Sequence, residues 1–190
     1  MNVVGLLLAA GSATRFGSDK LRHDLPHGVA IAVQSARHLT KELELVFAVV
    51  RPGAEDLASR LKKENCQIVV CDNAAEGMGA SLACAARAAG RRDGYLVALA
   101  DMPFVRPSSI AAVRDALAGG APLAAPFFHA RRGHPVGIAG AFYPQLLLLG
   151  GDEGAKAVLA NHKILKIPVG DPGVIRDIDT PADLAPPARV

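Results

Sequence analysis

The sequence contains no tryptophan, and aromatic residues make up only 4% of its 190 residues. The core must therefore be built from Ala, Val, Leu and Ile, and few rings are left for stacking nucleobases. The basic residues lie in scattered pairs such as Arg91-Arg92, and the formal net charge is only +3. Because nucleic-acid binders usually carry a concentrated basic stripe, both deficits argue against nucleic acid as a partner.

Long apolar runs are also missing, and we expect no leader segment. No run approaches the roughly 20 residues needed to cross a bilayer. We expect the first strand to begin at Val3, which leaves no room for a secretory signal. The three cysteines, Cys66, Cys71 and Cys84, cannot all pair, which favours reduced core thiols over metal or redox chemistry. We therefore expect a soluble, cytoplasmic protein without a membrane partner.

Several catalytic motifs are absent as well. The six histidines show no HExxH spacing and there is no GxSxG, so zinc hydrolases and serine hydrolases lack support. The glycine spacing of a Walker loop and the GxGxxG of a dinucleotide-binding loop are also absent. A nicotinamide-dependent oxidoreductase therefore ranks last among the functions considered.

The chain does show an alternation of strand-like and helix-like segments. This predicts an α/β fold, a Rossmann-like three-layer sandwich with a mainly parallel sheet, in one domain spanning residues 1–190. A loop leading into a short strand is expected over Arg132–Gly140. The other expected strands are Val3–Ala9, Leu43–Val50, Gln67–Cys71, Tyr95–Ala100, Pro122–Phe128 and Ile164–Val169, and the expected helices are Val29–Thr40, Ala54–Lys63, Ala80–Ala89, Ser108–Ala118, Tyr143–Leu149 and Glu153–Asn161.

In such sheets, ligands bind beyond the carboxyl ends of the strands. Three segments fall there, and we expect them at the same edge of the sheet: Ala10–Lys20, Asp72–Ser81 and Asp101–Pro103. In the second segment, Ser81 is expected near the start of a helix, either as a plain N-cap or beside a bound anion or nucleobase.

The first of these segments is flanked by glycines and carries two cations. Gly11 and Gly17 allow backbone N–H groups to approach an anion closely, while Arg15 and Lys20 suit phosphate contacts. The segment is therefore interpreted either as a phosphate-binding turn or as an ordinary turn with two solvated cations.

Acidic residues follow two of the expected strands. Asp101 ends an apolar strand, where a charge is costly unless it is solvated, paired or bound to a cation. It suits Mg²⁺ ligation, or else a simple turn. Asp177 and Asp179 follow the last strand, and we expect them to face different ways, one as a ligand and the other as a cap or ion-pair partner. Alternatively, Asp179 is an N-cap ahead of Pro181.

Taken together, these segments resemble the nucleotidyltransferases of the molybdenum-cofactor type, which include molybdenum cofactor cytidylyltransferase. LAAGSATRFGSDKL resembles the family signature LAAGxSxRxGxxK. GMGASL, ADMP, RRGHPVG, GGDEGAKAVL and DIDTPADL resemble its later blocks, in the right order. The segment after Lys20 departs from the pattern, since LRHDLPHGVAIAV stands where the family commonly has LLPxxGxPLL.

The resemblance implies a set of site residues. The catalytic residues would be Arg15, Lys20 and Asp101, and Asp101 and Asp179 would bind Mg²⁺. The Gly133-His134-Pro135 loop would face the acceptor. The nucleotide would be held at its base, ribose and phosphates by Leu8, Ala9, Ala10, Gly11, Arg15, Lys20, Gly79 and Ser81.

The resemblance also implies a reaction. Ala10 stands where the guanylyltransferase branch typically carries Gly, which favours CTP over GTP. CMP would pass from CTP to molybdopterin with release of pyrophosphate, and a molybdoenzyme or its chaperone would be a further partner. Three alternatives stay open: GTP as the donor, a sugar or polyol phosphate as the acceptor, and a non-catalytic nucleotide- or cofactor-binding module.

Overall fold

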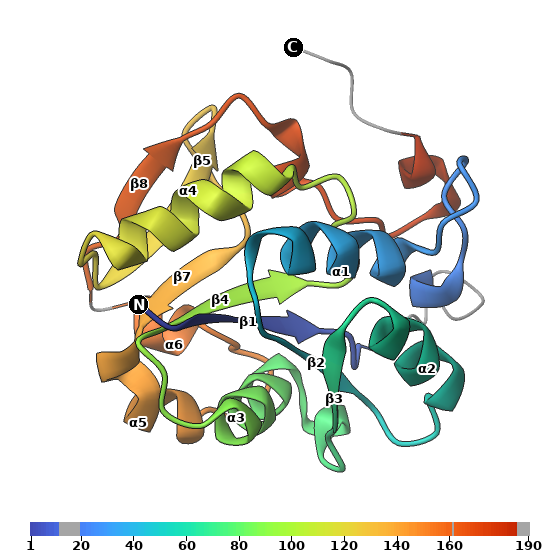
Figure 1. The fold of residues 1–190 in the computed structure, drawn as a ribbon, viewed down its shortest axis with the longest axis horizontal. Coiled ribbons are helices and arrows are strands. Elements are labelled where there is room, and N and C mark those ends of the chain that lie inside the picture. Colours follow the sequence, from blue (N-terminus) through green and yellow to red (C-terminus); the bar gives the residue numbers. More distant parts are fainter. Residues whose placement is uncertain (12–19, 161, 186–190) are drawn as a thin grey trace.

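The structure, a computed structural model, describes residues 1–11, 20–160 and 162–185. Its strands form one mixed sheet in the order β3-β2-β1-β4-β7-β5-β6, with β8 also paired to β5 (Figure 1). The strands are β1 Val3–Leu8, β2 Val46–Val50, β3 Cys66–Val70, β4 Gly94–Leu99, β5 Leu123–Phe128, β6 Arg131–Arg132, β7 Val136–Ala139 and β8 Leu165–Pro168.

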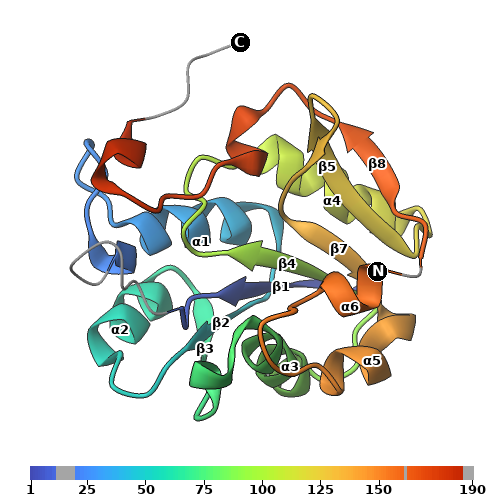
Figure 2. The same cartoon turned by 180° about the vertical axis from the view of Figure 1, so that it is seen from behind.

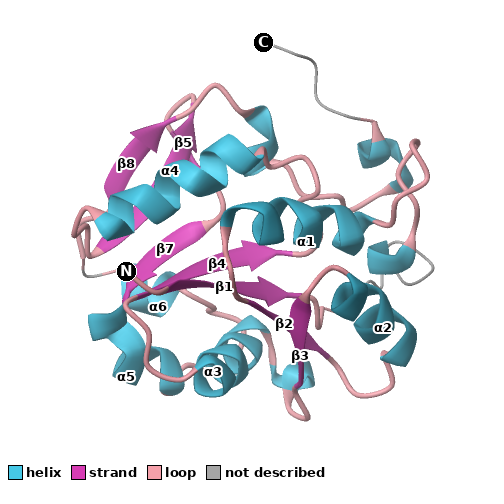
Figure 3. Ribbon diagram, in the orientation of Figure 1, coloured by secondary structure: helices cyan, strands magenta, loops and turns pink. Residues whose placement is uncertain are grey.

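The helices alternate with these strands, as the sequence predicts (Figure 3). None of the helices in the described ranges is long and apolar enough to span a lipid bilayer. The α-helices are α1 Ile31–Glu42, α2 Glu55–Lys63, α3 Met78–Ala89, α4 Pro107–Ala118, α5 Tyr143–Leu147 and α6 Lys156–Leu159, and the 3-10 helices are η1 Lys20–Arg22, η2 Ala74–Glu76, η3 Gly140–Phe142, η4 Pro172–Ile175 and η5 Pro181–Leu184.

The pairing confirms a mainly parallel sheet. β1 lies parallel to both β2 and β4, β2 lies parallel to β3, and β5 lies parallel to β8. β7 is the short strand expected within Arg132–Gly140, and it runs antiparallel to its two neighbours, β4 and β5. The parallel strands β1, β3 and β4 therefore direct their carboxyl ends toward one edge.

Helices cover both faces of the sheet, which gives the three expected layers. Side chains of β1 alternate between two cores: Leu7 packs with α1, α2 and α4, whereas Leu6 packs with α3, α5 and α6. In Figure 1, α1 and α4 lie above the strands and α3, α5 and α6 lie below them; Figure 2 shows the same layers from behind. All six residues of β1 are buried, and each large side chain there contributes about 1.5–3 kcal/mol through burial.

Several element boundaries differ from the expected ones. β2 begins at Val46 and not at Leu43, because the Leu43 N–H caps α1 by donating to the Leu39 carbonyl over 3.0 Å. α3 begins at Met78, and the expectation that Ser81 starts this helix as an N-cap is wrong. Gly77 occupies the cap position with φ of 128°, a value that favours glycine.

Candidate active site

A cavity of about 640 Å³ opens at the edge to which β1, β3 and β4 point. Its lining includes Gly11 after β1, Asp72 after β3, Ser81 in α3 and Asp101 after β4. The expectation that three separate chain segments meet at one edge is therefore confirmed for their described parts. A concave site of this size suits a nucleotide-sized ligand.

Lys20 joins the acidic residues at this cavity. Its Nζ lies 3.0 Å from Oδ2 of Asp101 and 3.1 Å from Oδ1 of Asp179. The partners are 81 and 159 residues away along the chain. In both views the C-terminal segment returns beside the segment that follows residue 20 (Figures 1 and 2). The two ends of the chain are thus clamped together by ion pairs at the cavity.

Asp177 also belongs to this cluster. Carboxylate oxygens of Asp101, Asp177 and Asp179 all lie within 4.8 Å of one another. The expectation that Asp177 and Asp179 face different ways is wrong. Residues two apart in an extended segment share a side, and Ile178 between them is fully buried in the core. The Ile178 N–H donates to the backbone carbonyl of Asp101 over 2.9 Å, which fixes both acids beside Asp101.

In this cluster, burial and ion pairing shift the pKa values of Lys20 and Asp101 in opposite directions. Burial raises the pKa of Asp101 and the nearby Asp177 adds to this, while Lys20 opposes it; the net direction is upward. Burial alone would lower the pKa of Lys20, but the charges and hydrogen bonds of Asp101 and Asp179 outweigh it. Lys20 therefore stays a cation at neutral pH.

The donor set of the cluster fits a hard cation. Three carboxylate groups offer one oxygen each to a common point, and oxygen ligands are those that Mg²⁺ and Mn²⁺ prefer. The ammonium of Lys20 binds two of the same carboxylates. A divalent ion and Lys20 would therefore compete for these oxygens.

In another part of the cavity wall, the start of α3 packs against the loop before α6. The Gly79 N–H donates to the Gly151 carbonyl over 2.7 Å, and a side chain at Gly79 would collide with the Gly150 carbonyl. Ser81 donates from Oγ to the Gly77 carbonyl over 3.3 Å. Asp152 of the same loop lines the cavity. The glycines of this region thus permit a close backbone approach that shapes the cavity wall.

The expected site residues fall into four groups, one of which is Asp179 alone, paired with Lys20 beside the cavity. Six of them line the cavity: Leu8, Ala10, Gly11, Lys20, Ser81 and Asp101. Ala9 packs into the core on the side of α1, α2 and α4, and Gly79 lies under the Gly150–Gly151 backbone. Arg15 and Gly17 lie outside the described residues.

Sequence reasoning allowed only one of Asp177 and Asp179 as a ligand, and it gave Asp152 no role at the cavity. The spacing of the DIDT segment could have shown that both acids share a side, since Asp177 lies two residues before Asp179. Asp152 lies in the GGDEGAKAVL block, but that block gave it no role. The contacts of the Gly150–Asp152 segment with Gly77 and Gly79 place it at the cavity.

The Gly133-His134-Pro135 loop packs inward. The His134 backbone N–H donates to the Val174 carbonyl over 2.8 Å. The imidazole lines a second, much smaller cavity of about 10 Å³ together with His38 and Met102. Burial lowers the pKa of His134 to about 4, so this imidazole is neutral at pH 7.

A comparison with known protein families identifies the family of this chain. The family described as the MobA-like NTP transferase domain matches residues 5–166. The chain belongs to this family. The expected relation to nucleotidyltransferases of the molybdenum-cofactor type is thereby confirmed at the level of the family.

Two curated relatives match this NTP transferase chain over most of its length. The purine catabolism protein PucB of Bacillus subtilis is 28% identical and the match covers 95% of this chain and 93% of the relative. Nicotine blue oxidoreductase of Paenarthrobacter nicotinovorans is 30% identical, with 94% of this chain and 92% of the relative covered. The relatives thus carry different activity names on related sequences.

Solved structures share the fold of this NTP transferase. Rv0371c of Mycobacterium tuberculosis superimposes with a TM-score of 0.83 at 22% identity, covering 96% of this chain and 94% of that one. A structure of Rv0371c in complex with manganese is also similar, with a TM-score of 0.79. Molybdopterin-guanine dinucleotide biosynthesis protein A of Archaeoglobus fulgidus gives a TM-score of 0.68 at 20% identity, with 95% and 94% covered. At these identities the likeness concerns the fold.

Proposed function

We propose that this NTP transferase moves CMP from CTP to molybdopterin in a Mg²⁺-dependent reaction that releases pyrophosphate. The observation that carries the proposal is the meeting of Lys20 with Asp101, Asp177 and Asp179 beside the Gly11 turn. A cavity whose lining includes small residues such as Gly11 and Ser81 as well as Lys20 and Asp101 suits a nucleoside triphosphate whose phosphates lie near Lys20.

The reaction would be an in-line substitution at the α-phosphorus. An oxygen of the acceptor phosphate attacks that atom, the bond to the β-phosphate oxygen breaks, and pyrophosphate leaves with the bonding electrons. Such a transfer needs little covalent help from the protein, so positioning and charge neutralisation dominate. The residues of this chain would therefore act by binding and orienting both phosphates.

The turn after β1 would hold the ribose side of the nucleotide. A side chain at Gly11 would meet no atom of the described residues within 4 Å, so packing against those residues does not require glycine there. The bare backbone instead leaves room for a ligand against the chain, as glycine permits. Ala10 and Leu8 line the same cavity, and the methyl group that Ala10 adds in place of glycine supports the preference for CTP that the family resemblance implies.

Lys20 and the three acids would act on the phosphates. Lys20 is already protonated and held at the cavity by two ion pairs, so it is placed to offset negative charge on the phosphates and on departing pyrophosphate. Asp101, Asp177 and Asp179 would hold the divalent ion. When bound, such an ion supplies charge neutralisation and a template for acceptor and donor phosphates. Arg15 is expected to add a second cation to the triphosphate.

A pyrophosphate-release assay tests the proposal. The full chain is incubated with Mg²⁺ and molybdopterin, with CTP and GTP compared, and then with sugar and polyol phosphates in place of molybdopterin. We expect the fastest release with CTP and molybdopterin. Preference for GTP, or for another acceptor, contradicts the stated substrates. Tight nucleotide binding without pyrophosphate release from any pair indicates a binding module.

A second candidate function is an oxidoreductase, because the chain is 30% identical to the relative named nicotine blue oxidoreductase. The two functions differ in their need for the acidic cluster. Oxidation of NADH or NADPH in the presence of an electron-accepting dye, at equal rates in wild type and Asp101→Asn, would favour the oxidoreductase. Pyrophosphate release that the same substitution abolishes would favour the nucleotidyltransferase.

A further inference from the structure

Two of the three cysteines lie side by side behind the cavity wall. Cys71 follows β3, and its Sγ lies 3.9 Å from the carbonyl of Ala80 in α3. Cys84 lies one turn further along α3, and its Sγ lies 4.0 Å from the carbonyl of Val70, the residue before Cys71. Cys71 thus contacts the helix backbone one turn before Cys84, and Cys84 contacts the residue before Cys71. The Cys71 thiol also donates to Oδ1 of Asn73 over 3.3 Å.

The pair combines one accessible thiol with one protected thiol. Cys84 is half-buried, whereas Cys71 is fully buried. Burial, with a further contribution from the Cys84 thiol, raises the pKa of Cys71 to about 11. A solute oxidant therefore reaches Cys84 first, and Cys71 is positioned to react second.

Cys66 offers an internal contrast. It lies at the other end of β3 and contacts the Glu64 carbonyl at 3.9 Å. Burial raises the pKa of Cys66 to about 12, and the thiol is buried. Cys66 is therefore expected to stay a reduced core thiol, as the sequence predicts for all three cysteines.

We propose that Cys71 and Cys84 form a reversible disulfide when the protein meets a hydroperoxide. The Cys84 sulfur attacks the O–O bond of hydrogen peroxide, which gives a sulfenic acid and one water molecule. The Cys71 thiol then attacks that sulfur, so the S–S bond forms as the S–O bond breaks and a second water molecule leaves. Two thiols are oxidised and one peroxide is reduced to two waters, so the step balances.

The disulfide would act on the cavity through α3. Ser81 lies three residues before Cys84, on the same side of the helix, and lines the cavity, as does Asp72, which directly follows Cys71. An S–S bond is about 2.05 Å long, shorter than any contact between unbonded sulfurs, so its formation draws α3 toward the end of β3. The expected effect on turnover rests on the proposed function. We expect turnover of the oxidised protein to fall by about tenfold, because small displacements of the groups that position the substrate slow the reaction strongly.

Peptide mapping of the oxidised full-length protein tests the disulfide without any substrate. The reduced chain is treated with hydrogen peroxide, free thiols are alkylated, and the protein is analysed intact and after proteolysis. We expect the loss of two hydrogen atoms, a crosslink between the peptides of Cys71 and Cys84, and full reversal by dithiothreitol. Because this readout needs no nucleotide, it can succeed or fail independently of the proposed reaction.

Two variants make the result specific. Cys84→Ser removes the half-buried thiol and should abolish the intramolecular crosslink, whereas Cys66→Ser should leave it unchanged. Oxidation of Cys84 to the sulfinic or sulfonic acid without a crosslink overturns the proposal. So do a disulfide between two protein molecules, a crosslink to Cys66, or a protein whose mass does not change.

Discussion

Two clusters of ionisable side chains lie at two different cavities, and Leu99 is among the lining residues of each. In the cluster at the cavity of about 640 Å³, Lys20 forms ion pairs with Asp101 and Asp179 at 3.0 and 3.1 Å. In the small cavity of about 10 Å³, His38 and His134 are enclosed among apolar residues. Ion pairing keeps Lys20 charged in the first cluster, and burial keeps the two histidines neutral in the second.

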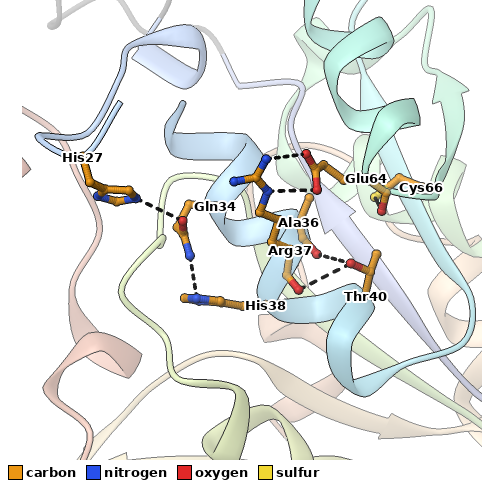
Figure 4. A network of polar contacts seen from close by, with 8 residues as sticks. All are labelled: His27, Gln34, Ala36, Arg37, His38, Thr40, Glu64 and Cys66. Atoms are coloured by element: carbon orange, nitrogen blue, oxygen red, sulfur yellow. Dashed lines mark hydrogen bonds and ion pairs between the residues drawn. The ribbon is translucent and has the colours of Figure 1, made fainter. Parts of the chain in front are cut away.

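The histidine cluster continues outward into a polar network on α1. The Nε2 atoms of His38 and Gln34 lie 2.6 Å apart, and Gln34 Oε1 lies 3.2 Å from His27 Nε2 (Figure 4). Burial lowers the pKa of both His38 and His134. The contrast shows that enclosure alone does not decide charge: a close partner of opposite sign outweighs burial at Lys20, whereas burial prevails at the two histidines.

Of the substitutions that test this difference between the two clusters, neutralising Asp101 should have the largest effect. In Asp101→Asn the cluster loses its most enclosed carboxylate, so we expect pyrophosphate release to fall by about 10²–10³-fold, as loss of one preorganised charge commonly does. Asp115→Asn, which alters an exposed residue of α4 paired with Arg114, is the matched control and should keep near-normal turnover. Near-normal turnover in Asp101→Asn would refute the assignment of this carboxylate to the centre.

The neutral cluster predicts a pH dependence of stability. The pKa of His134 is about 4 in the folded chain and about 6.5 in the unfolded chain. Between these values the unfolded state binds more protons, so the free energy of unfolding rises with pH up to about 6.5. The loss on acidification to pH 4 is up to about 3 kcal/mol. Urea unfolding at a series of pH values measures this slope.

Substitution of His134 isolates its share of that slope. His134→Gln should flatten the stability profile between about pH 4 and pH 6.5, because the titrating imidazole is gone. His27→Gln, at an exposed position of the network in Figure 4, should keep the slope. Equal slopes in wild type and His134→Gln would show that this imidazole does not titrate as described.

Removing the Lys20 cation should have a smaller effect, which lowers turnover but strengthens Mn²⁺ binding. In Lys20→Met we expect turnover to fall by about tenfold, since one charge contact to the phosphates is lost. Without nucleotide, Mn²⁺ should bind more tightly than to wild type by about tenfold, because Lys20 no longer competes for Asp101 and Asp179. Isothermal titration with Mn²⁺ gives the affinity, and Lys166→Met on β8 is the control. Weaker Mn²⁺ binding in Lys20→Met would contradict the competition.

The sequence predicted the layers, most strands and the edge that carries the site, because apolar runs and helical spacing report burial directly. The antiparallel placement of β7 between β4 and β5 could not be predicted, since pairing between distant segments leaves no local pattern. The start of α3 at Met78 depends on the fit of Gly77 and Gly79 against the Gly150–Asp152 backbone, another distant contact.

The candidate site shows the same limit. Motif resemblance indicated Lys20, Asp101 and Asp179 one by one, and the structure shows them in contact across 81 and 159 residues of chain. Asp177 was assigned to a different side from Asp179, although alternation along an extended segment places residues two apart together. The inward packing of His134 could not be anticipated, because nothing in GHPVG distinguishes a loop open to ligand from one held by Val174.

The most direct test of the account measures whether nucleotide and divalent ion bind as one complex. Mn²⁺ affinity of the full chain is determined with and without CTP, in wild type and in the triple variant Asp101→Asn, Asp177→Asn, Asp179→Asn. The account predicts that CTP tightens Mn²⁺ binding to wild type, that Mn²⁺ tightens CTP binding by the same factor, and that the coupling vanishes in the triple variant. Independent binding of the two ligands to wild type, or equal coupling in both proteins, would contradict it.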